Sequence, residues 1–405
     1  MSNPTDHALS EARAIAYILD RGLASPQEAV TKGLKVEAVS RRNCNFSVTD
    51  CRGTGWFLKQ GQAGEQFGTV AYEAAAYRAF AGDMASSAFA RCLPEFIDFD
   101  AAANILTIRL VDHATTFYRD AVDKAPSLDA IAGFARALAS LHSLRSPHGT
   151  SGLASHPPPL VLTLDAPPVT FYGEASKTSI ELIKTLQQEV DLMRRLRELR
   201  EAWRSERLIH YDVKLSNILA RGRPARFASI IDLEYLGYGD PCWDIGSVFA
   251  AYLDLWLATM PLAGGTTADR YATLATFPLT SAQAAMAAFW QAYAAASAAH
   301  GSDVANLVDC ARFAAARLIH TAVELAMATP TMTNRIAALV QLGDNVLRDP
   351  SRAVAELFGF EHFPEKWTPV FRRKCDQPKA ARAPSDSLEA ESALAGAEKA
   401  REHVC

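Results

Sequence analysis

"RLIHYDVKLSNILA", residues 207 to 220, places four polar residues in one short stretch between apolar residues: His210, Asp212, Lys214 and Asn217. The spacing H-x-D-x-x-x-x-N is typical of a loop that prepares a hydroxyl for attack on a phosphoryl group. One carboxylate must face the hydroxyl and take its proton. An amide five residues later can turn back and hold a metal ion against the phosphates. We therefore predict Asp212 as the base and Asn217 as a ligand of Mg²⁺.

A second carboxylate closes the next apolar run, in "SIIDLEYLGYGDPCWDIG", residues 229 to 246. Asp232 stands where a kinase places the aspartate that bridges Mg²⁺ to the nucleotide phosphates. Two metal-directed groups, each at the end of an apolar run, favour a catalytic role over surface decoration. Glu234 follows closely. We predict structural support for it, with an indirect acidic role or a further magnesium ligand as alternatives.

These two stretches, together with "ALASLHS" at 137 to 143, resemble the aminoglycoside phosphotransferase and choline kinase superfamily over roughly residues 35 to 345. The resemblance implies Asp212 as catalytic base and magnesium ligation by Asn217 and Asp232. It also implies structural support of the loops by His210, Asp240 and Asp244.

The base loop departs from the usual pattern of the small-molecule kinases, because it contains H-Y-D where they have H-G-D. Tyr211 therefore adds bulk beside the base. Lys214 matches the position at which protein kinases steady the transferred phosphoryl group, so we include it among the catalytic residues.

The same resemblance implies a lysine on the third strand and a glutamate on the next helix, which together bind the phosphates of ATP. "GWFLKQG" offers Lys59 and "TVAYEAAAY" offers Glu73. The turn that should cover the phosphates, "SRRNCNFSV", contains no glycine. We predict that its backbone amides act there, helped by Ser40, Arg41, Arg42 and Asn43.

The pattern along the chain predicts an α+β, two-lobed protein-kinase-like fold. Short runs rich in β-branched and aromatic residues at 34–60 and 93–112 indicate a small antiparallel sheet. Helical periodicity dominates afterwards, including one long amphipathic helix at 179–203, and a proline-rich insert at 145–169 should run over the surface. The predicted divisions are a helical segment at 1–33, a nucleotide-binding lobe at 34–118, a helical lobe with the catalytic and metal-binding loops at 119–348, and a partly disordered extension at 349–405.

The composition limits which binding partners and which cellular compartment we expect for this protein. The net charge of −4 argues against a general nucleic-acid binder. The longest apolar stretch carries Asp254 in its middle, which favours a core helix over a membrane span. The seven cysteines are widely spaced without a C-x-x-C pair, and the N-terminus lacks the pattern of a signal peptide. We expect a cytoplasmic protein that binds neither nucleic acid nor membrane.

The acceptor is the open question. Helices of the second half offer candidate pocket residues, namely Asp254, Trp256, Trp290, Tyr293 and Glu324. The segments "SRRNCNF", "FLKQG", "EAAAY" and "GSVFAAYLDLW" also resemble the kinase-like proteins of class V lanthipeptide maturation, a part of peptide natural product biosynthesis. Those proteins phosphorylate Ser and Thr of a precursor peptide before a separate lyase eliminates the phosphate, so this resemblance implies a peptide acceptor and a partner lyase.

The predicted function is an ATP- and Mg²⁺-dependent transfer of phosphate to a hydroxyl of a small molecule or a peptide. A kinase fold that has become a catalytically inactive binding scaffold is the non-enzymatic alternative. Because such scaffolds typically lose the base or a metal ligand, the presence of Lys59, Asp212, Asn217 and Asp232 favours an enzyme.

Overall fold

A computed structural model describes residues 9–40, 44–61, 70–123, 126–145, 153–261, 272–301 and 305–360. All of these belong to one compact unit, residues 1–370. Arg41, Arg42, Asn43 and the chain after residue 360 lie outside the described residues, and so does the side chain of Ser40. The predictions made for them, and the division into four segments, stay predictions.

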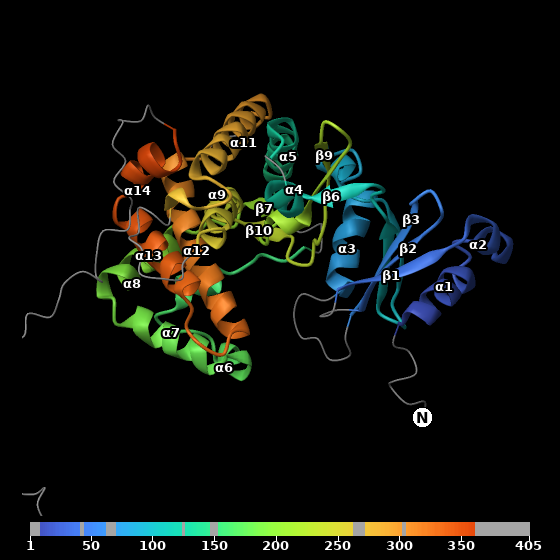
Figure 1. The fold of residues 1–405 in the computed structure, drawn as a ribbon, viewed down its shortest axis with the longest axis horizontal. Coiled ribbons are helices and arrows are strands. Elements are labelled where there is room, and N and C mark those ends of the chain that lie inside the picture. The colour runs from blue at the N-terminus through green and yellow to red at the C-terminus, as the bar shows by residue number, and fades with distance from the viewer. Residues whose placement is uncertain are drawn as a thin grey trace, which may run out of the picture. The chain divides into compact units, whose positions relative to one another are not determined.

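The N-terminal part is an antiparallel sheet of five strands in the order β1-β2-β3-β5-β4, preceded by two helices (Figure 1). The first helix ends before Gly22 and the second starts after Ser25, whose side chain accepts from the Glu28 amide as an N-cap. The elements are α1 (Glu11–Asp20), α2 (Pro26–Lys32), β1 (Lys35–Ser40), β2 (Cys44–Thr49), β3 (Gly55–Gln60), α3 (Val70–Ala81), β4 (Phe96–Asp100) and β5 (Ile105–Arg109).

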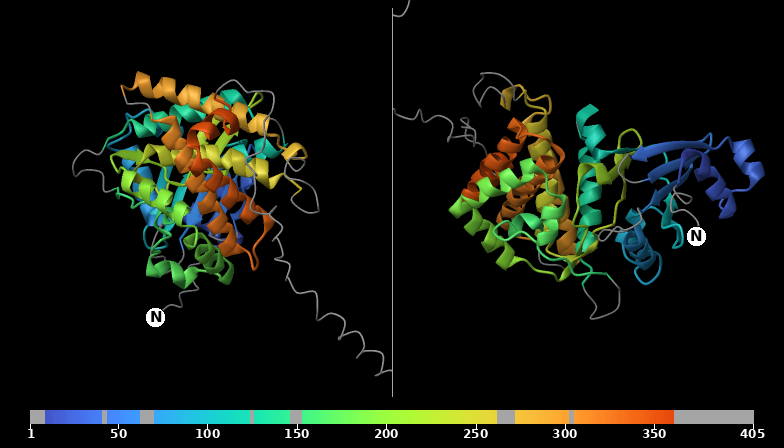
Figure 2. Two further views of the ribbon diagram at one scale, coloured as in Figure 1. Left: turned by 90° about the vertical axis from the view of Figure 1, so that its left-hand side faces the viewer. Right: turned by 90° about the horizontal axis from the view of Figure 1, so that it is seen from below.

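The two faces of this sheet contact different parts of the molecule. Side chains alternate along a strand, so Leu58 and Lys59 on β3 point to opposite faces. Leu58 belongs to an apolar cluster that also contains Ile18 of α1 and Val48 of β2. Lys59 points the other way, where it meets Glu73 of α3. Figures 1 and 2 show α1 and α2 at the end of the sheet that is remote from the helical part of the chain.

The rest of the described chain is mostly helical, which confirms the predicted α+β class. Helix α9 is buried along nearly its whole length, with Trp243, Phe249 and Trp256 fully inside, and α12 packs against it. The helices are α4 (Phe117–Asp123), α5 (Leu128–His142), α6 (Val169–Glu174), α7 (Lys177–Gln187), α8 (Val190–Ala202), α9 (Pro241–Ala258), α11 (Leu279–Ala299), α12 (Leu307–Ala328), α13 (Asn334–Arg348) and α14 (Pro350–Arg352).

Two small sheets frame the predicted catalytic loops. One pairs β7 with β10, and the other has the order β6-β8-β9. Strands β7, β8 and β9 correspond to the apolar runs beside the two polar stretches of the sequence. Their bounds are β6 (Ala114–Thr116), β7 (Arg207–Ile209), β8 (Ile218–Arg221), β9 (Arg226–Ile230) and β10 (Gly237–Gly239).

Two sequence expectations for the helical part were wrong. The stretch 179–203 is not one helix, because Glu189 leaves the helical region between α7 and α8, with ψ at 82°. The two halves then pack against different partners. The insert after residue 145 is also not confined to the surface. Its described part buries Val161, Leu162 and Leu164, and packs against α8 and α12.

The close approach of α9 and α12 depends on Gly246. A Cβ atom at this position would lie 2.6 Å from the backbone nitrogen of Ala314. We expect Gly246→Ala to lower the free energy of unfolding by about 1–3 kcal/mol, because the backbone of α12 would have to move. The matched control is Gly173→Ala in α6, where a Cβ meets nothing within 4 Å. This control should be neutral or stabilising by up to about 1 kcal/mol.

Urea unfolding of both variants tests the expectation through the midpoint shift at constant slope. Equal midpoints for the two variants would show that the helix contact tolerates an extra methyl group.

Candidate active site

The loop of the predicted base starts where β7 ends. Leu208 and Ile209 of β7 are buried, so the strand fixes the point at which His210 and the following residues leave the sheet. Tyr211 then adopts a left-handed conformation with φ at +70°, which is rare for a residue with a side chain. Backbone strain of this kind persists only where surrounding contacts hold it.

Those contacts come largely from the buried carboxylate of Asp244 on α9. Its Oδ2 accepts from the His210 amide at 2.7 Å, and its Oδ1 accepts from the Tyr211 amide at 2.9 Å. The Nε2 atom of His142 lies 3.1 Å from Oδ2 and donates to it, while Nδ1 lies 2.8 Å from the hydroxyl of Tyr293. Asp244 is fully buried. The base loop is therefore held from behind by one carboxylate that bonds two consecutive amides.

The ring of Tyr211, the residue that departs from H-G-D, fits into an aromatic group. It lies 4.7 Å from the ring of His156 and 6.2 Å from those of Tyr235 and Trp243, between centroids. Its carbonyl accepts from Trp243 Nε1 at 2.7 Å, and its hydroxyl donates to the Pro157 carbonyl at 3.3 Å. Burial raises the pKa of the Tyr211 phenol, so it stays neutral. The insert therefore supports the base loop.

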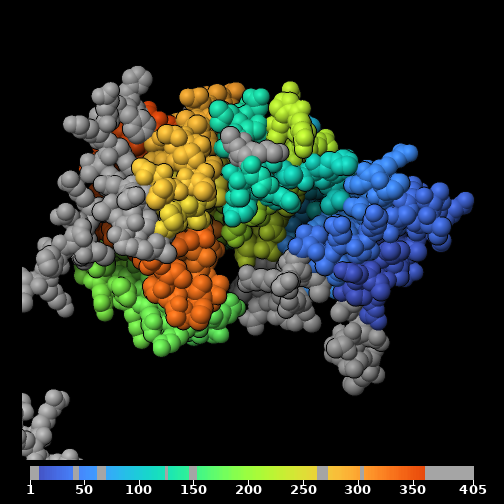
Figure 3. All heavy atoms as spheres, viewed as in Figure 1, coloured from blue at the N-terminus to red at the C-terminus, as the bar shows by residue number. Residues whose placement is uncertain are grey.

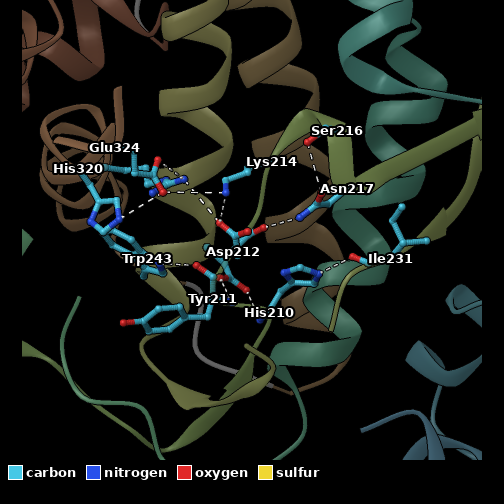
Figure 4. Close-up of polar contacts among 12 residues, drawn as sticks. His210, Tyr211, Asp212, Lys214, Ser216, Asn217, Ile231, Trp243, His320 and Glu324 are labelled. Atoms are coloured by element: carbon cyan, nitrogen blue, oxygen red, sulfur yellow. Dashed lines mark hydrogen bonds and ion pairs between the residues drawn. The ribbon is translucent and has the colours of Figure 1, made fainter. Parts of the chain in front are cut away.

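Asp212 lies next in the loop, beside Lys214 and Asn217 (Figure 4). Its Oδ1 lies 3.0 Å from Nζ of Lys214 and 3.7 Å from a terminal nitrogen of Arg317. The side-chain amide of Asn217 donates to the Asp212 carbonyl at 3.1 Å. This bond folds the loop back so that base and amide lie side by side, as the five-residue spacing predicted.

Asp232 follows β9 and, like Tyr211, has φ at +70°. Its loop is tied to the base loop, because Nε2 of His210 donates to the Ile231 carbonyl at 3.0 Å, and the Ile231 amide donates to the Asn217 carbonyl at 3.0 Å. His210 thus holds the backbones of both loops. The two polar stretches identified in the sequence meet in space.

Lys59 joins the sheet to these loops. Its Nζ lies 2.7 Å from Glu73 Oε2, 2.7 Å from Asp232 Oδ1 and 3.1 Å from Glu234 Oε2. Only 6% of the Lys59 side chain is exposed. One buried ammonium therefore has three carboxylates as neighbours, and these come from α3 and from the loop after β9.

The charge balance of this group is uneven. Burial alone would lower the pKa of Lys59, but the attraction of Glu73, Asp232 and Glu234 outweighs burial and raises it, so the ammonium stays charged. Burial, and also repulsion by Asp232, raise the pKa of Glu73 and of Glu234 against the attraction of Lys59. One cation does not neutralise three carboxylates, so the group has surplus negative charge.

This donor set fits a magnesium ion. Ligand oxygens of Glu73, Asp232 and Glu234 all lie within 4.8 Å of one another. Oxygen ligands from carboxylates and amides are those that Mg²⁺ prefers. The amide of Asn217 lines the same cavity as Asp232, and its Oδ1 accepts a long hydrogen bond of 3.4 Å from the hydroxyl of Ser216.

Two of the cavities beside the loops are lined by the predicted metal ligands and by the predicted base. The first, of about 520 Å³, lies between the sheet and the helical part and is lined by Lys59, Glu73, Asn217 and Asp232. The second, of about 790 Å³, is lined by Asp212, Lys214 and Glu234, and also by residues of α6 and α12. Figure 3 shows a hollow beside the orange atoms of α12. Lys59 and Glu73, which are predicted to bind phosphates, thus face one cavity, and the predicted base faces the other.

The remaining predicted residues divide into two groups. Asp240 caps α9 by accepting from the amides of Cys242 at 2.9 Å and Arg204 at 3.3 Å, and burial raises the pKa of its carboxyl. The residues predicted to line the acceptor pocket lie in several different places, and their role stays a prediction. Glu324 lines the second cavity, whereas Trp256 is in the core, Asp254 pairs with Arg335, and Tyr293 bonds His142. Trp290 stacks on Tyr293 instead of lining the second cavity.

Arg317 on α12 is the residue that the sequence reasoning missed. It bridges Asp212 and Glu324 and lies with its guanidinium 5.9 Å from the ring centroid of Trp243. His320 lines the second cavity as well, 3.5 Å from Glu324. The available signal was a charged pair inside the apolar run "AARLIHTAVELA", which is unusual for a buried helix.

Comparisons with known proteins agree with this architecture. Residues 36–279 match the family described as "Phosphotransferase enzyme family" (APH), which covers more than half of the chain. The chain therefore belongs to this phosphotransferase family, and the superfamily resemblance predicted from its motifs is confirmed. No curated protein matches the chain.

Among solved structures, the choline kinase of Cryptosporidium parvum is similar at 13% identity and a TM-score of 0.53, over 85% of this chain and 96% of that one. The choline kinase LicA of Streptococcus pneumoniae has 13% identity and a TM-score of 0.49, over 83% and 99%. An aminoglycoside phosphotransferase of Streptomyces rimosus has 16% identity and a TM-score of 0.43, over 82% and 99%. The first of these supports the protein-kinase-like fold.

None of the helices in the described part of the chain is long and apolar enough to cross a membrane.

Asp244 offers a test of how the base loop is held. We expect Asp244→Ala to lower the free energy of unfolding by about 3 kcal/mol, because two buried amides and His142 lose their acceptor. Glu201→Ala, which removes an exposed carboxylate on α8, is the control and should change stability by less than about 0.5 kcal/mol. Urea unfolding measures both; similar midpoints would mean that Asp244 does not hold the loop.

Proposed function

We propose that this protein is an ATP- and Mg²⁺-dependent phosphotransferase that moves the γ-phosphoryl group to a hydroxyl of a small molecule, with Asp212 as the base. The observation that carries this proposal is the convergence of Lys59, Asn217 and Asp232 on one cavity, with Asp212 facing the adjoining cavity. Membership of the phosphotransferase family supports the class of reaction. In this proposal the segment 34–118 holds the nucleotide and the segment 119–348 carries the catalytic loops.

The first cavity suits a nucleotide because its lining changes character from one side to the other. Val39, Leu219 and Ile231 are apolar and would pack against a base. Lys59 supplies a fixed positive charge for the α- and β-phosphates and is held by Glu73 at 2.7 Å. We keep Ser40 and Asn43 as predicted contributors to phosphate binding from the turn between the first two strands.

Metal binding requires an exchange of partners at Lys59. Bound Mg²⁺ would neutralise charge on the β- and γ-phosphates, and Asp232 and Asn217 would hold it, with Glu234 as a candidate further ligand. Asp232 and Glu234 now contact the ammonium at 2.7 and 3.1 Å, so Lys59 must release them while keeping Glu73. The surplus negative charge of the group favours this exchange.

Asp212 takes the proton in the transfer step. The acceptor oxygen forms a bond to the γ-phosphorus, and the bond from that phosphorus to the β,γ-bridging oxygen breaks. ADP leaves with the electron pair of that bond, and the hydroxyl proton passes to the carboxylate of Asp212 and then to solvent. Lys214, 3.0 Å from Asp212, would steady the transferred group as a point charge.

The acceptor belongs in the second cavity, whose volume of about 790 Å³ is of the size that holds small molecules. The peptide acceptor and the partner lyase find no support in the comparisons and stay predictions from the weaker resemblance. An inactive scaffold is the remaining alternative, and magnesium-dependent turnover of ATP distinguishes it from an enzyme.

Asp212→Asn tests the base. We expect it to lower magnesium-dependent ADP release from ATP by at least about 100-fold, because the amide cannot take the proton. ADP affinity, measured by calorimetry, should stay within about twofold because the base does not line the nucleotide cavity. Asp83→Asn, at an exposed carboxylate, is the matched control. A wild-type rate no higher than that of Asp212→Asn would support the scaffold.

Metal titration tests the ligands. Asp232→Ala should abolish the magnesium-dependent part of ATP turnover, since the main carboxylate ligand is lost. Asn217→Ala should raise the magnesium concentration for half-maximal turnover by about tenfold or more. Unchanged magnesium curves in both variants, with the fold intact by circular dichroism, would place the metal elsewhere.

A further inference from the structure

The base is held by a residue from a distant helix as well as by its own loop. Arg317 leaves α12 and reaches Asp212, with one terminal nitrogen 3.7 Å from Oδ1. Lys214 reaches the same oxygen, at 3.0 Å. Two cations on one oxygen of a carboxylate fix its rotation, because turning the group would exchange the favoured oxygen for the other one.

Arg317 is itself fixed by its surroundings. Only 7% of its side chain is exposed, and the same terminal nitrogen lies 3.4 Å from Glu324 Oε2. Its guanidinium lies 5.9 Å from the ring centroid of Trp243, within the range of a cation–π contact. Trp243 also donates to the carbonyl of Tyr211, so one indole contacts both the arginine and the base loop.

Glu324 completes the cluster by balancing its charge. It lies 3.4 Å from Arg317, 3.5 Å from His320 and 4.0 Å from Lys214. Burial opposes its ionisation, but Arg317 and then the hydrogen bond with His320 hold the pKa of Glu324 well below its ordinary value. Glu324 is therefore ionised at neutral pH. The two carboxylates of Asp212 and Glu324 and the two cations of Lys214 and Arg317 all line the second cavity.

We propose that Arg317 is a positioning residue for phosphoryl transfer. It holds Oδ1 of Asp212 so that Oδ2 faces the acceptor hydroxyl, and Glu324 and Trp243 hold Arg317 in place. This inference rests on the proposed function, because it gives Asp212 the role of base. It predicts that Arg317 acts only through Asp212 and contributes nothing to nucleotide binding, since it does not line the nucleotide cavity.

Lysine should replace Arg317 only in part. The planar guanidinium can contact Asp212, Glu324 and Trp243 together, whereas an ammonium is a point charge on a flexible stem. Arg317→Lys keeps the positive charge but loses the fixed orientation of the planar guanidinium, and Arg317→Met loses both the charge and the planar group. The two variants therefore separate charge from geometry.

The test uses ATP hydrolysis, with water as the probe acceptor and Mg²⁺ present. We expect Arg317→Met to lower kcat by about 10- to 100-fold, as misplaced catalytic groups do, with KM for ATP within about twofold. Arg317→Lys should fall between it and the wild type. Arg200→Met is the matched control, because Arg200 forms an ion pair of 2.7 Å with Asp165 and lines neither the first nor the second cavity. It should keep the wild-type kcat.

The decisive comparison is a double-mutant cycle. If Arg317 acts through Asp212, Asp212→Asn combined with Arg317→Met should be no slower than Asp212→Asn alone. Losses that multiply would overturn the proposal, and so would an Arg317→Met kcat equal to that of Arg200→Met. If Arg317→Met does not fold, Arg317→Lys decides by the same cycle.

The outcomes also separate this inference from the proposed function. If Asp212→Asn leaves the rate of ATP hydrolysis unchanged, Asp212 is not the base, and both the proposed function and this inference are overturned. If the rate of hydrolysis falls in Asp212→Asn but not in Arg317→Met, only the inference about Arg317 is overturned.

Discussion

One buried ammonium connects the two halves of this site. Lys59 comes from the sheet, and the three carboxylates around it come from α3 and from the loop after β9. Removing these charges from water is costly, so each needs the others in place. The contact therefore joins the sheet to the loop after β9. It also leaves more negative charge than one cation can balance, which suits a site that takes up a divalent ion.

The base loop depends on a second buried charge. Asp244 bonds two consecutive amides and so stabilises a left-handed Tyr211, which a tyrosine would not adopt by itself. The cost of that conformation, about 1–3 kcal/mol, is offset by these bonds and by the aromatic neighbours of the ring. Asp212 is thereby directed into one cavity, while Asn217 lines the other. Because Asp244 holds the backbone of the loop, this short loop can place Asp212 in one cavity and Asn217 in the other.

Much of the fold could be predicted because its patterns are local. Runs rich in β-branched and aromatic residues predicted the sheet, and helical periodicity predicted the mostly helical part that follows. Strands β6 and β10, of three residues each, are too short to show a period. The division of 179–203 into α7 and α8 was missed because both halves are amphipathic, and only their different packing partners require the break.

The sequence by itself determined which polar residues the two loops carry, because the spacing from His210 to Asn217 and the position of Asp232 are fixed along the backbone. Only the tertiary structure decided which helix completes the site. A charged residue on a helix has the same sequence signature whether it faces solvent or a catalytic carboxylate. The packing of α12 on α9 brought Arg317 and Glu324 to Asp212, and left Trp256 and Asp254 elsewhere. Side-chain direction across a helix interface depends on the packing of both helices, which neither segment specifies alone.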